Sequence, residues 1–181
     1  MFVFGHVGLT TLTARVIEKS TSEKRIDYRL VVIGSLLPDL IDKPIGRILF
    51  RNRFESGRVY AHTLAFVLVL ISIGLYRLYR YKKIGWLVLA GGSILHAIFD
   101  QMWMFPKILF WPFLSGAFNK PAAHGAAKGP LAWVPPEYHR LIINPYIYIP
   151  EIIGAIVIIY FVIRLYRYRG FSTFLKTGTI L

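Results

Sequence analysis

The chain has 181 residues, enough for one domain, and 55% of them are hydrophobic, a composition that argues against a soluble domain. It contains no cysteine, which excludes disulfides and thiolate metal sites, so any metal must use nitrogen and oxygen ligands. The 22 Lys and Arg against 9 Asp and Glu give a net charge of +13. This charge suits anionic lipids or phosphate-bearing substrates. We expect no nucleic acid partner, because the basic residues flank apolar segments.

The apolar segments predict an all-α, polytopic membrane helical bundle in one domain, residues 1–181. Residues 1–17 are mildly apolar and lack the basic and small-residue features of a cleaved signal, so we interpret them as an N-terminal helix of the mature chain. A short apolar segment spans about 30–41, and three longer ones, about 59–76, 84–104 and 145–163, could each cross a bilayer core of roughly 30 Å. We expect about four membrane-embedded or spanning helices besides the N-terminal one.

Two basic and aromatic clusters set the expected orientation. The clusters YRLYRYKK (76–83) and RLYRYR (164–169) each close an apolar span and resemble juxtamembrane anchors, with Tyr at headgroup level and Lys or Arg beyond it. If both clusters are cytoplasmic, the C-terminus is cytoplasmic, and the spans that begin at 59 and 145 start at the outer face. We therefore expect an integral protein of the cell membrane.

The connection over residues 105–144 is long and rich in proline and aromatic residues. Loops of this length are commonly functional or disordered. Because so much aromatic surface is unusual in a solvated linker, we expect this loop to lie on the membrane face and partly cover a site.

Six ionisable residues lie in or at the ends of the apolar segments, where a charge is most costly. Such groups by default mark a functional site. They are His6, Asp39, His62, His96, Asp100 and Glu151. With the orientation above, and an N-terminal helix that runs inward, all six fall at the outer end of the bundle. We therefore expect one site toward the outer face.

Two local patterns support metal binding. In HAIFD, His96 and Asp100 are four residues apart on an expected helix, so both side chains can reach one ion; the alternative is an internal hydrogen-bonded pair. In GSLLPDLIDKP, Asp39 follows Pro38 and Asp42 lies three residues later. A proline within an apolar run is tolerated where the freed backbone groups line a protected cavity. The alternative is a short helix that starts at Pro38, with both carboxylates in its first turn.

In this order the motifs resemble the YdjM-type family of membrane-bound metal-dependent hydrolases. An early His, a G-S-x-x-P-D block, a His that opens a span and an H-x-x-x-D helix recur there. The matching positions are His6, residues 34–39, His62, and His96 with Asp100, and W-P-F at 111–113 fits a further element. The resemblance covers roughly residues 1–113.

The ligand order is also similar to that of zinc-dependent phospholipase C and the S1/P1 nucleases. That resemblance implies that Asp39, His62, His96 and Asp100 share one ion and that His6 and Asp100 help to hold a second. Those enzymes add two His and a Glu downstream. Here His124 and His139 have suitable mutual spacing, but Ile143 stands where the Glu would be, so we do not expect a complete third metal site.

These observations predict a membrane-embedded hydrolase of phosphoester bonds in a lipid or lipid-linked substrate. A divalent metal, zinc or alternatively manganese, would activate water. Asp42 and Glu151 are the candidate catalytic residues, as partners of a ligand or as proton acceptors. The candidate phosphate-binding residues, which could instead form a solvated interfacial stretch, are Lys43, Arg47, Arg51, Arg53 and Arg58. The alternative functions are a non-enzymatic membrane protein with a structural metal and a divalent-cation transporter. Membrane lipids are the expected partners, and the oligomeric state is left open.

Overall fold

A computed structural model describes residues 2–21, 26–50, 57–114 and 144–180, and these residues confirm the all-α class. They form seven α-helices, a π-helical turn, η1 (Pro44–Leu49), and a 3-10 turn, η2 (Met102–Met104). The α-helices are α1 (Val3–Thr21), α2 (Tyr28–Lys43), α4 (Leu64–Tyr81), α5 (Gly85–Phe99), α6 (Pro106–Leu109), α8 (Pro145–Arg167) and α9 (Phe171–Thr177).

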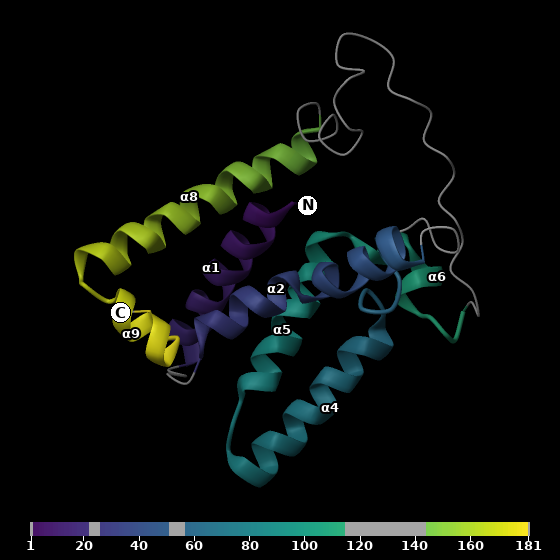
Figure 1. Cartoon of the computed structure of the whole chain (residues 1–181), viewed down its shortest axis with the longest axis horizontal. Helices are drawn as coiled ribbons and strands as arrows, with labels where there is room; N and C mark the ends of the chain where they lie inside the picture. The colour runs from purple at the N-terminus through teal and green to yellow at the C-terminus, as the bar shows by residue number, and fades with distance from the viewer. Residues whose placement is uncertain (1, 22–25, 51–56, 115–143, 181) are drawn as a thin grey trace.

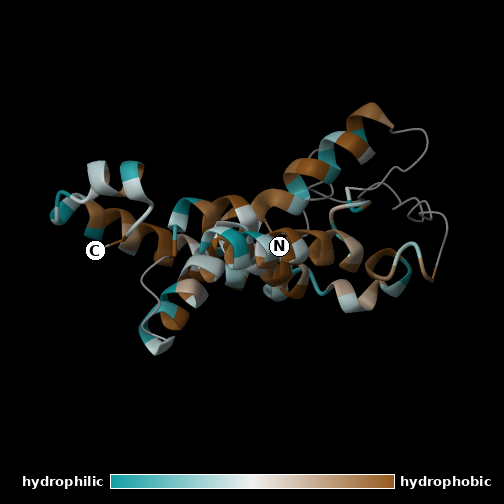
Figure 2. Ribbon diagram, turned by 90° about the horizontal axis from the view of Figure 1, so that it is seen from below, coloured by the Kyte–Doolittle hydropathy of each residue, from teal (hydrophilic) through white to brown (hydrophobic). Residues whose placement is uncertain are grey.

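Two helices of the described chain, α4 and α8, are long and apolar enough to cross a membrane. Only 17% of the apolar window of each is buried, whereas the core helix of a soluble protein would be mostly covered. Large apolar side chains such as Val69 and Ile156 are more than half exposed. Figure 2 shows hydrophobic residues along much of the helical ribbon. An exposed apolar surface of this extent fits contact with lipid.

The expected span over 84–104 is shorter than predicted. Helix α5 has 15 residues, which gives a length of about 22 Å, less than the roughly 30 Å of a bilayer core. It ends at Phe99, where Asp100 is the C-cap and Gln101 adopts a left-handed conformation with φ of 53°. Two of the described helices, not three, are therefore both long and apolar enough to cross a membrane.

The boundaries around the polar motifs also differ from the expectations. Helix α2 continues through Pro38 to Lys43, so the alternative of a short helix starting at Pro38 is wrong, and the two carboxylates lie in the last turns of α2. The apolar segment that begins at 59 enters its helix only at Leu64. Thr63 caps this helix, and its hydroxyl accepts a hydrogen bond of 3.1 Å from the Phe66 amide. His62 therefore lies in a turn before α4.

The helices pack in the order α8, α1, α2, α5, α4, and Figure 1 shows their arrangement. The first residues of α1, α4 and α8 and the last residues of α2 and α5 point toward the same side of the molecule. At the other side, Tyr28 and Val31 of α2 are buried with Phe161 of α8 in an apolar core. The bundle thus has an apolar core at one end and brings polar helix termini together at the other.

Pairs of glycines let two helix pairs approach backbone to backbone. A Cβ atom on Gly92 of α5 would lie 2.7 Å from the carbonyl carbon of Gly34 in α2. A Cβ atom on Gly8 of α1 would lie 2.3 Å from the carbonyl oxygen of Gly154 in α8. Small residues permit such close packing between membrane helices. The two contacts hold α2 against α5 and α1 against α8.

The Gly92→Ala substitution is expected to lower the free energy of unfolding by about 1–3 kcal/mol, because the added methyl group must push α2 away from α5. Gly91→Ala is the matched control, since no atom of another described segment lies within 4 Å of its added methyl group. Alanine there should leave stability unchanged or raise it by up to ~1 kcal/mol through helix propensity. Thermal unfolding of both variants in one detergent, followed by circular dichroism, measures the difference. Equal loss of stability in both variants would contradict the role of this contact.

Candidate metal centre

The carboxylate of Asp42 holds together the turn that carries His62. Asp42 is completely buried, and its oxygens accept hydrogen bonds from the backbone amides of residues 59–62 at distances of 2.7 to 3.1 Å. The same carboxylate lies 2.7 Å from Nδ1 of His62. A carboxylate only accepts hydrogen bonds, so the proton of a neutral His62 ring is on Nδ1. Nε2 of His62 is left with an unshared electron pair.

His96 is oriented in the same way by a backbone carbonyl. Its Nδ1 lies 2.7 Å from the carbonyl oxygen of Ser35, which places the ring proton on Nδ1 and leaves Nε2 bare. The Nε2 atoms of His96 and His62 are 3.2 Å apart. The two unshared electron pairs repel each other at this distance. A cation bound to both nitrogens would remove this repulsion. The pair is thus arranged as metal-ligating histidines are, with the second ring nitrogen fixed by a hydrogen bond.

Asp39 adds an oxygen to the two histidine nitrogens. Its Oδ1 atom is 3.6 Å from Nε2 of His62 and 3.9 Å from Nε2 of His96. Ligands of tetrahedral zinc, with bonds of 2.0–2.1 Å, lie about 3.3 Å from one another. The three atoms therefore fit one zinc ion after small side-chain movements, and such an ion would keep a fourth position for another ligand.

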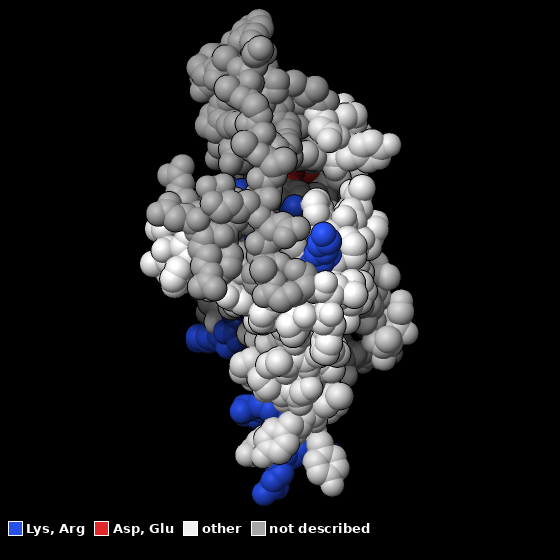
Figure 3. Space-filling model, turned by 90° about the vertical axis from the view of Figure 1, so that its right-hand side faces the viewer, with Lys and Arg blue, Asp and Glu red and all other residues white. Residues whose placement is uncertain are grey.

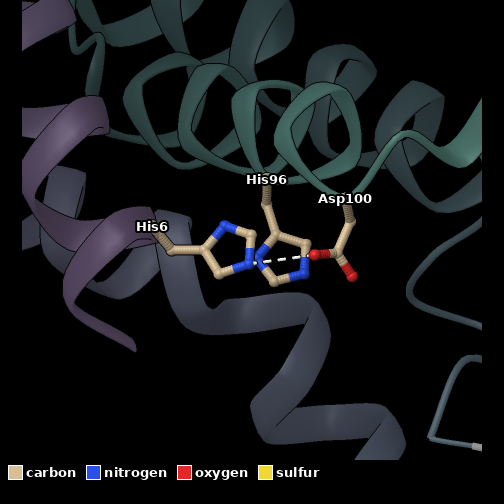
Figure 4. A group of neighbouring side chains, drawn as sticks. All are labelled: His6, His96 and Asp100. Atoms are coloured by element: carbon tan, nitrogen blue, oxygen red, sulfur yellow. Dashed lines mark hydrogen bonds and ion pairs between the residues drawn. The ribbon is translucent and has the colours of Figure 1, made fainter. Parts of the chain in front are cut away.

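A second group that can hold a metal ion joins His6 of α1 to His96 and Asp100. Figure 4 shows His6 directed at Asp100 with the His96 ring beside it. Nε2 of His6 is 3.2 Å from Oδ1 of Asp100, and the rings of His6 and His96 stack with centroids 4.0 Å apart. Nδ1 of His6 is buried and has no hydrogen-bond partner in the described part of the chain. Because Nδ1 of His96 is engaged, only its Nε2 can bind metal, and one ion at a time.

The five expected metal ligands therefore come together from three helices, α1, α2 and α5, and from the turn before α4. The pair from the H-x-x-x-D motif remains adjacent across the end of α5, where the amide of Asp100 donates to the carbonyl of His96 at 2.9 Å. Asp39, His62 and His96 form one group, and His6, His96 and Asp100 form the other. This division differs in part from the arrangement that the resemblance implied, because Asp100 is absent from the first group and His96 belongs to both groups.

Two of the expected phosphate-binding cations contact the outer oxygens of the ligand carboxylates. Nζ of Lys43 lies 2.6 Å from Oδ2 of Asp39, and the guanidinium of Arg58 lies 2.6 Å from Oδ2 of Asp100. In each carboxylate Oδ1 is directed toward a histidine while Oδ2 is held by a cation. Such partners orient a carboxylate so that it offers one oxygen to a metal.

The other expected phosphate-binding residues are less closely placed. Arg47 of η1 is exposed, and a Cβ atom on Gly57 would lie 3.0 Å from its Nε. Arg51 and Arg53 lie outside the described residues. Of the three cations that the structure describes, Lys43 and Arg58 contact expected ligands.

The two candidate catalytic residues occupy different positions. Asp42 supports His62 and the turn before it, as described above. Glu151 of α8 is 8% exposed, and its Oε1 accepts a hydrogen bond of 2.7 Å from the backbone amide of Phe2. Neither residue belongs to the groups that can hold an ion among the described residues. The geometry favours a positioning role for Asp42 and an anchoring contact for Glu151 at the start of α1.

An apolar cavity of about 180 Å³ lies against the histidine pair. Its walls include His62 and His96, Val67 of α4, and Ala97 of α5, and residues 102–109 close one side through Met102, Trp103 and Leu109. The sequence did not reveal this cavity or the carbonyl of Ser35. Both depend on how α2, α4 and α5 approach one another, and a backbone carbonyl leaves no signal in residue type.

The described beginning of the long loop contacts residues next to the site. The guanidinium of Arg58 lies over the Phe105 ring at 5.2 Å, and the rings of Tyr60 and Trp111 meet edge to face at 5.4 Å. This part of the loop therefore packs beside the cluster. Residues 115–143, with His124 and His139, lie outside the described part, so the expected cover over the site stays a prediction.

Substitutions of Asp42 and Asp39 are expected to separate the stability of the fold from the affinity for zinc. Asp42→Asn loses acceptor capacity for five donors, four of them in buried hydrogen bonds, so the metal-free protein should lose about 3 kcal/mol or more of unfolding free energy. Asp39→Asn should leave the metal-free stability within about 1 kcal/mol, since it loses mainly a partly exposed ion pair with Lys43, but should weaken zinc binding. Thermal unfolding without metal and zinc titration of both variants measure these effects. The assignment fails if Asp39→Asn binds zinc as tightly as the unmodified protein.

Comparison with known proteins agrees with the motif order. The model of the YdjM inner membrane protein family matches residues 1–174, well beyond the first 113 residues on which the sequence motifs lie. No curated protein and no solved structure matches the chain significantly. Because the family match extends over nearly the whole chain, this protein belongs to the YdjM inner membrane protein family.

Proposed function

We propose that this protein is a membrane-embedded, zinc-dependent hydrolase of phosphoester bonds in a lipid or lipid-linked substrate. The observation that carries the proposal is the triangle of Asp39 Oδ1, His62 Nε2 and His96 Nε2 beside an apolar cavity. Structural zinc sites are closed by four protein ligands, whereas catalytic sites use three and keep an open position. Three converging ligand atoms next to a cavity favour the catalytic type.

A divalent metal held by such ligands lowers the pKa of water and polarises phosphoryl oxygens. The protein's own groups fix the ligands. Asp42 and the Ser35 carbonyl set the orientation of His62 and His96, and Lys43 and Arg58 hold the carboxylates of Asp39 and Asp100. The three carboxylates outnumber the two cations by one charge, so a divalent ion would make the cluster positive. A positive cluster favours a phosphate group.

The apolar character of the cavity supports a lipid as substrate. Its volume of about 180 Å³ is below the 300–1,000 Å³ typical of sites that enclose a whole small ligand. It suits a segment of hydrocarbon chain whose polar part lies at the metal ligands. The cavity wall formed by α4 belongs to a candidate membrane span, so a lipid can approach from the bilayer.

The proposed orientation places the site toward the outer face and the C-terminus in the cytoplasm. The basic and aromatic clusters at 76–83 and 164–169 occupy the ends of α4 and α8. In contrast, His62 lies directly before α4, and the start of α1, which carries His6, contacts Glu151 in the first turns of α8. This separation is expected if the positive clusters stay inside. A conduction path for ions would instead distribute polar groups through the depth of the bundle, so the clustering favours hydrolysis over transport.

Replacement of Asp100 by Asn is expected to abolish hydrolysis of a phospholipid-like substrate in detergent, with a loss of at least about 100-fold. It should also reduce the metal content of the purified protein, because Asp100 carries one of the ligand oxygens. Asp27→Asn, which removes a carboxylate at the start of α2, is the matched control and should keep both the hydrolytic activity and the metal content. Unchanged turnover in Asp100→Asn would overturn the assignment. A protein that retains its metal but hydrolyses no phosphoester in any variant would support a structural metal instead.

Filling the apolar cavity should discriminate between lipid and water-soluble substrates. Ala97→Phe adds a ring to the cavity wall and is expected to lower kcat/KM for a long-chain phospholipid roughly tenfold. The kcat/KM for bis(p-nitrophenyl) phosphate, which has no hydrocarbon chain, should stay unchanged. Val69→Phe, on the exposed side of α4, serves as control. Equal losses for both substrates would argue against a chain-binding role of the cavity.

A further inference from the structure

A second cavity lies at the other end of α4, away from the metal ligands. It has a volume of about 650 Å³ and receives residues from four helices and from the turn between α4 and α5. Its polar and aromatic lining consists of Asp27, Arg77, Lys82, Lys83, Trp86 and Thr177. The function proposed above makes no use of this cavity.

The charge of the cavity is positive. Three cations line it, and the one carboxylate, Asp27, is already engaged by Arg29, whose Nε and guanidinium nitrogen approach its two oxygens at 3.0 and 2.6 Å. The hydrogen bond from Arg29 lowers the pKa of Asp27, so this carboxylate stays ionised and paired. The Nε atom of Arg77 is buried and has no hydrogen-bond partner within the described residues. The cavity therefore offers positive charge.

The backbone adds to this positive character. Lys82 caps α4 in a left-handed conformation with φ of 54°, and α5 begins three residues later at Gly85. Ile84, its N-cap residue, provides no side-chain hydrogen bond, so no capping side chain satisfies the first amides of α5. The start of a 15-residue helix carries partial positive charge and favours an anion. Ile84 and Gly85 both line the cavity, which joins this helix start to the cations.

The position of the cavity indicates the source of the anion. It lies where the candidate span α4 ends, and Tyr76, Tyr79 and Tyr81 in the last turns of α4 are exposed. Tyrosine and tryptophan are enriched at headgroup level. Figure 3 shows Lys and Arg side chains at the lower end of the molecule, the end toward which α4 descends in Figure 1. A ligand that enters here from the bilayer presents its phosphate at this level.

We propose that this cavity binds the phosphate of an anionic phospholipid headgroup, at the side of the membrane opposite the metal ligands. Arg77, Lys82 and Lys83 provide the charge, the start of α5 provides backbone amides, and Trp86 packs beside the headgroup. The site holds a lipid in place and performs no chemistry. It does not depend on the hydrolase activity.

The test uses the full-length protein in a neutral detergent, with Trp103, Trp111 and Trp133 replaced by Phe so that Trp86 reports binding. Short-chain phosphatidylglycerol, short-chain phosphatidylcholine and inorganic phosphate are titrated separately while Trp86 fluorescence is recorded. We expect a saturable change with phosphatidylglycerol and at least fivefold weaker binding of the other two ligands, since a surface cation contributes about a factor of five. Equal affinity for phosphatidylcholine overturns the proposal. Equal affinity for inorganic phosphate overturns its assignment to a lipid.

Two substitutions on one helix separate a specific site from general charge attraction. Arg77→Gln should weaken phosphatidylglycerol binding about fivefold, whereas Arg80→Gln, which removes the same charge from a residue outside the lining, should have no effect. If Arg77→Gln fails to fold, as judged by circular dichroism, Lys83→Gln replaces it, because Lys83 is exposed and lies beyond the end of α4. Equal weakening by the cavity variant and by Arg80→Gln would show that no specific site exists.

Discussion

The buried carboxylate of Asp42 is the group on which the candidate metal centre depends. A charge without solvent access is costly unless hydrogen bonds replace the lost water, and here four backbone amides and one imidazole nitrogen do so. The same bonds join the end of α2 to the turn before α4. Because Asp39 lies one turn before Asp42 on α2, fixing this turn also fixes the distance between Asp39 and His62.

The glycine contacts complete this arrangement by setting how closely the helices approach. The approach of Gly34 and Gly92 lets the Ser35 carbonyl reach Nδ1 of His96. The approach of Gly8 and Gly154 holds α1, with His6, against α8. Backbone contact between helices thus determines which nitrogen of His96 is available to a metal ion.

The molecule separates its polar functions between two ends. One end holds the histidines and carboxylates, with cations on the outer carboxylate oxygens and an apolar cavity beside them. The other end holds a cavity lined by three cations and the start of α5. This division fits the two proposals made above, a metal-dependent reaction at one membrane surface and a bound lipid headgroup at the other.

The sequence alone determined the helical class and the five residues that meet in the cluster. Apolar segments separated by basic and aromatic clusters are sufficient for the first. The five cluster residues follow from the cost of ionisable groups in apolar surroundings, because a histidine such as His6 or His96 in an apolar segment by default marks a functional site. The i, i+4 spacing of His96 and Asp100 also fixed their proximity, because it depends only on the geometry of one helix.

Only the tertiary structure decided the lengths of the helices and the roles around the ligands. Helix α5 ends at Phe99 although apolar residues continue, because Gln101 turns the backbone into a left-handed conformation. Asp42 became a support for His62, and Lys43 and Arg58 became partners of the ligand carboxylates, since these contacts join residues distant in the sequence or depend on side-chain direction. The sequence places an ionisable residue at the end of an apolar segment, but the approach of neighbouring helices decides which atom that residue contacts.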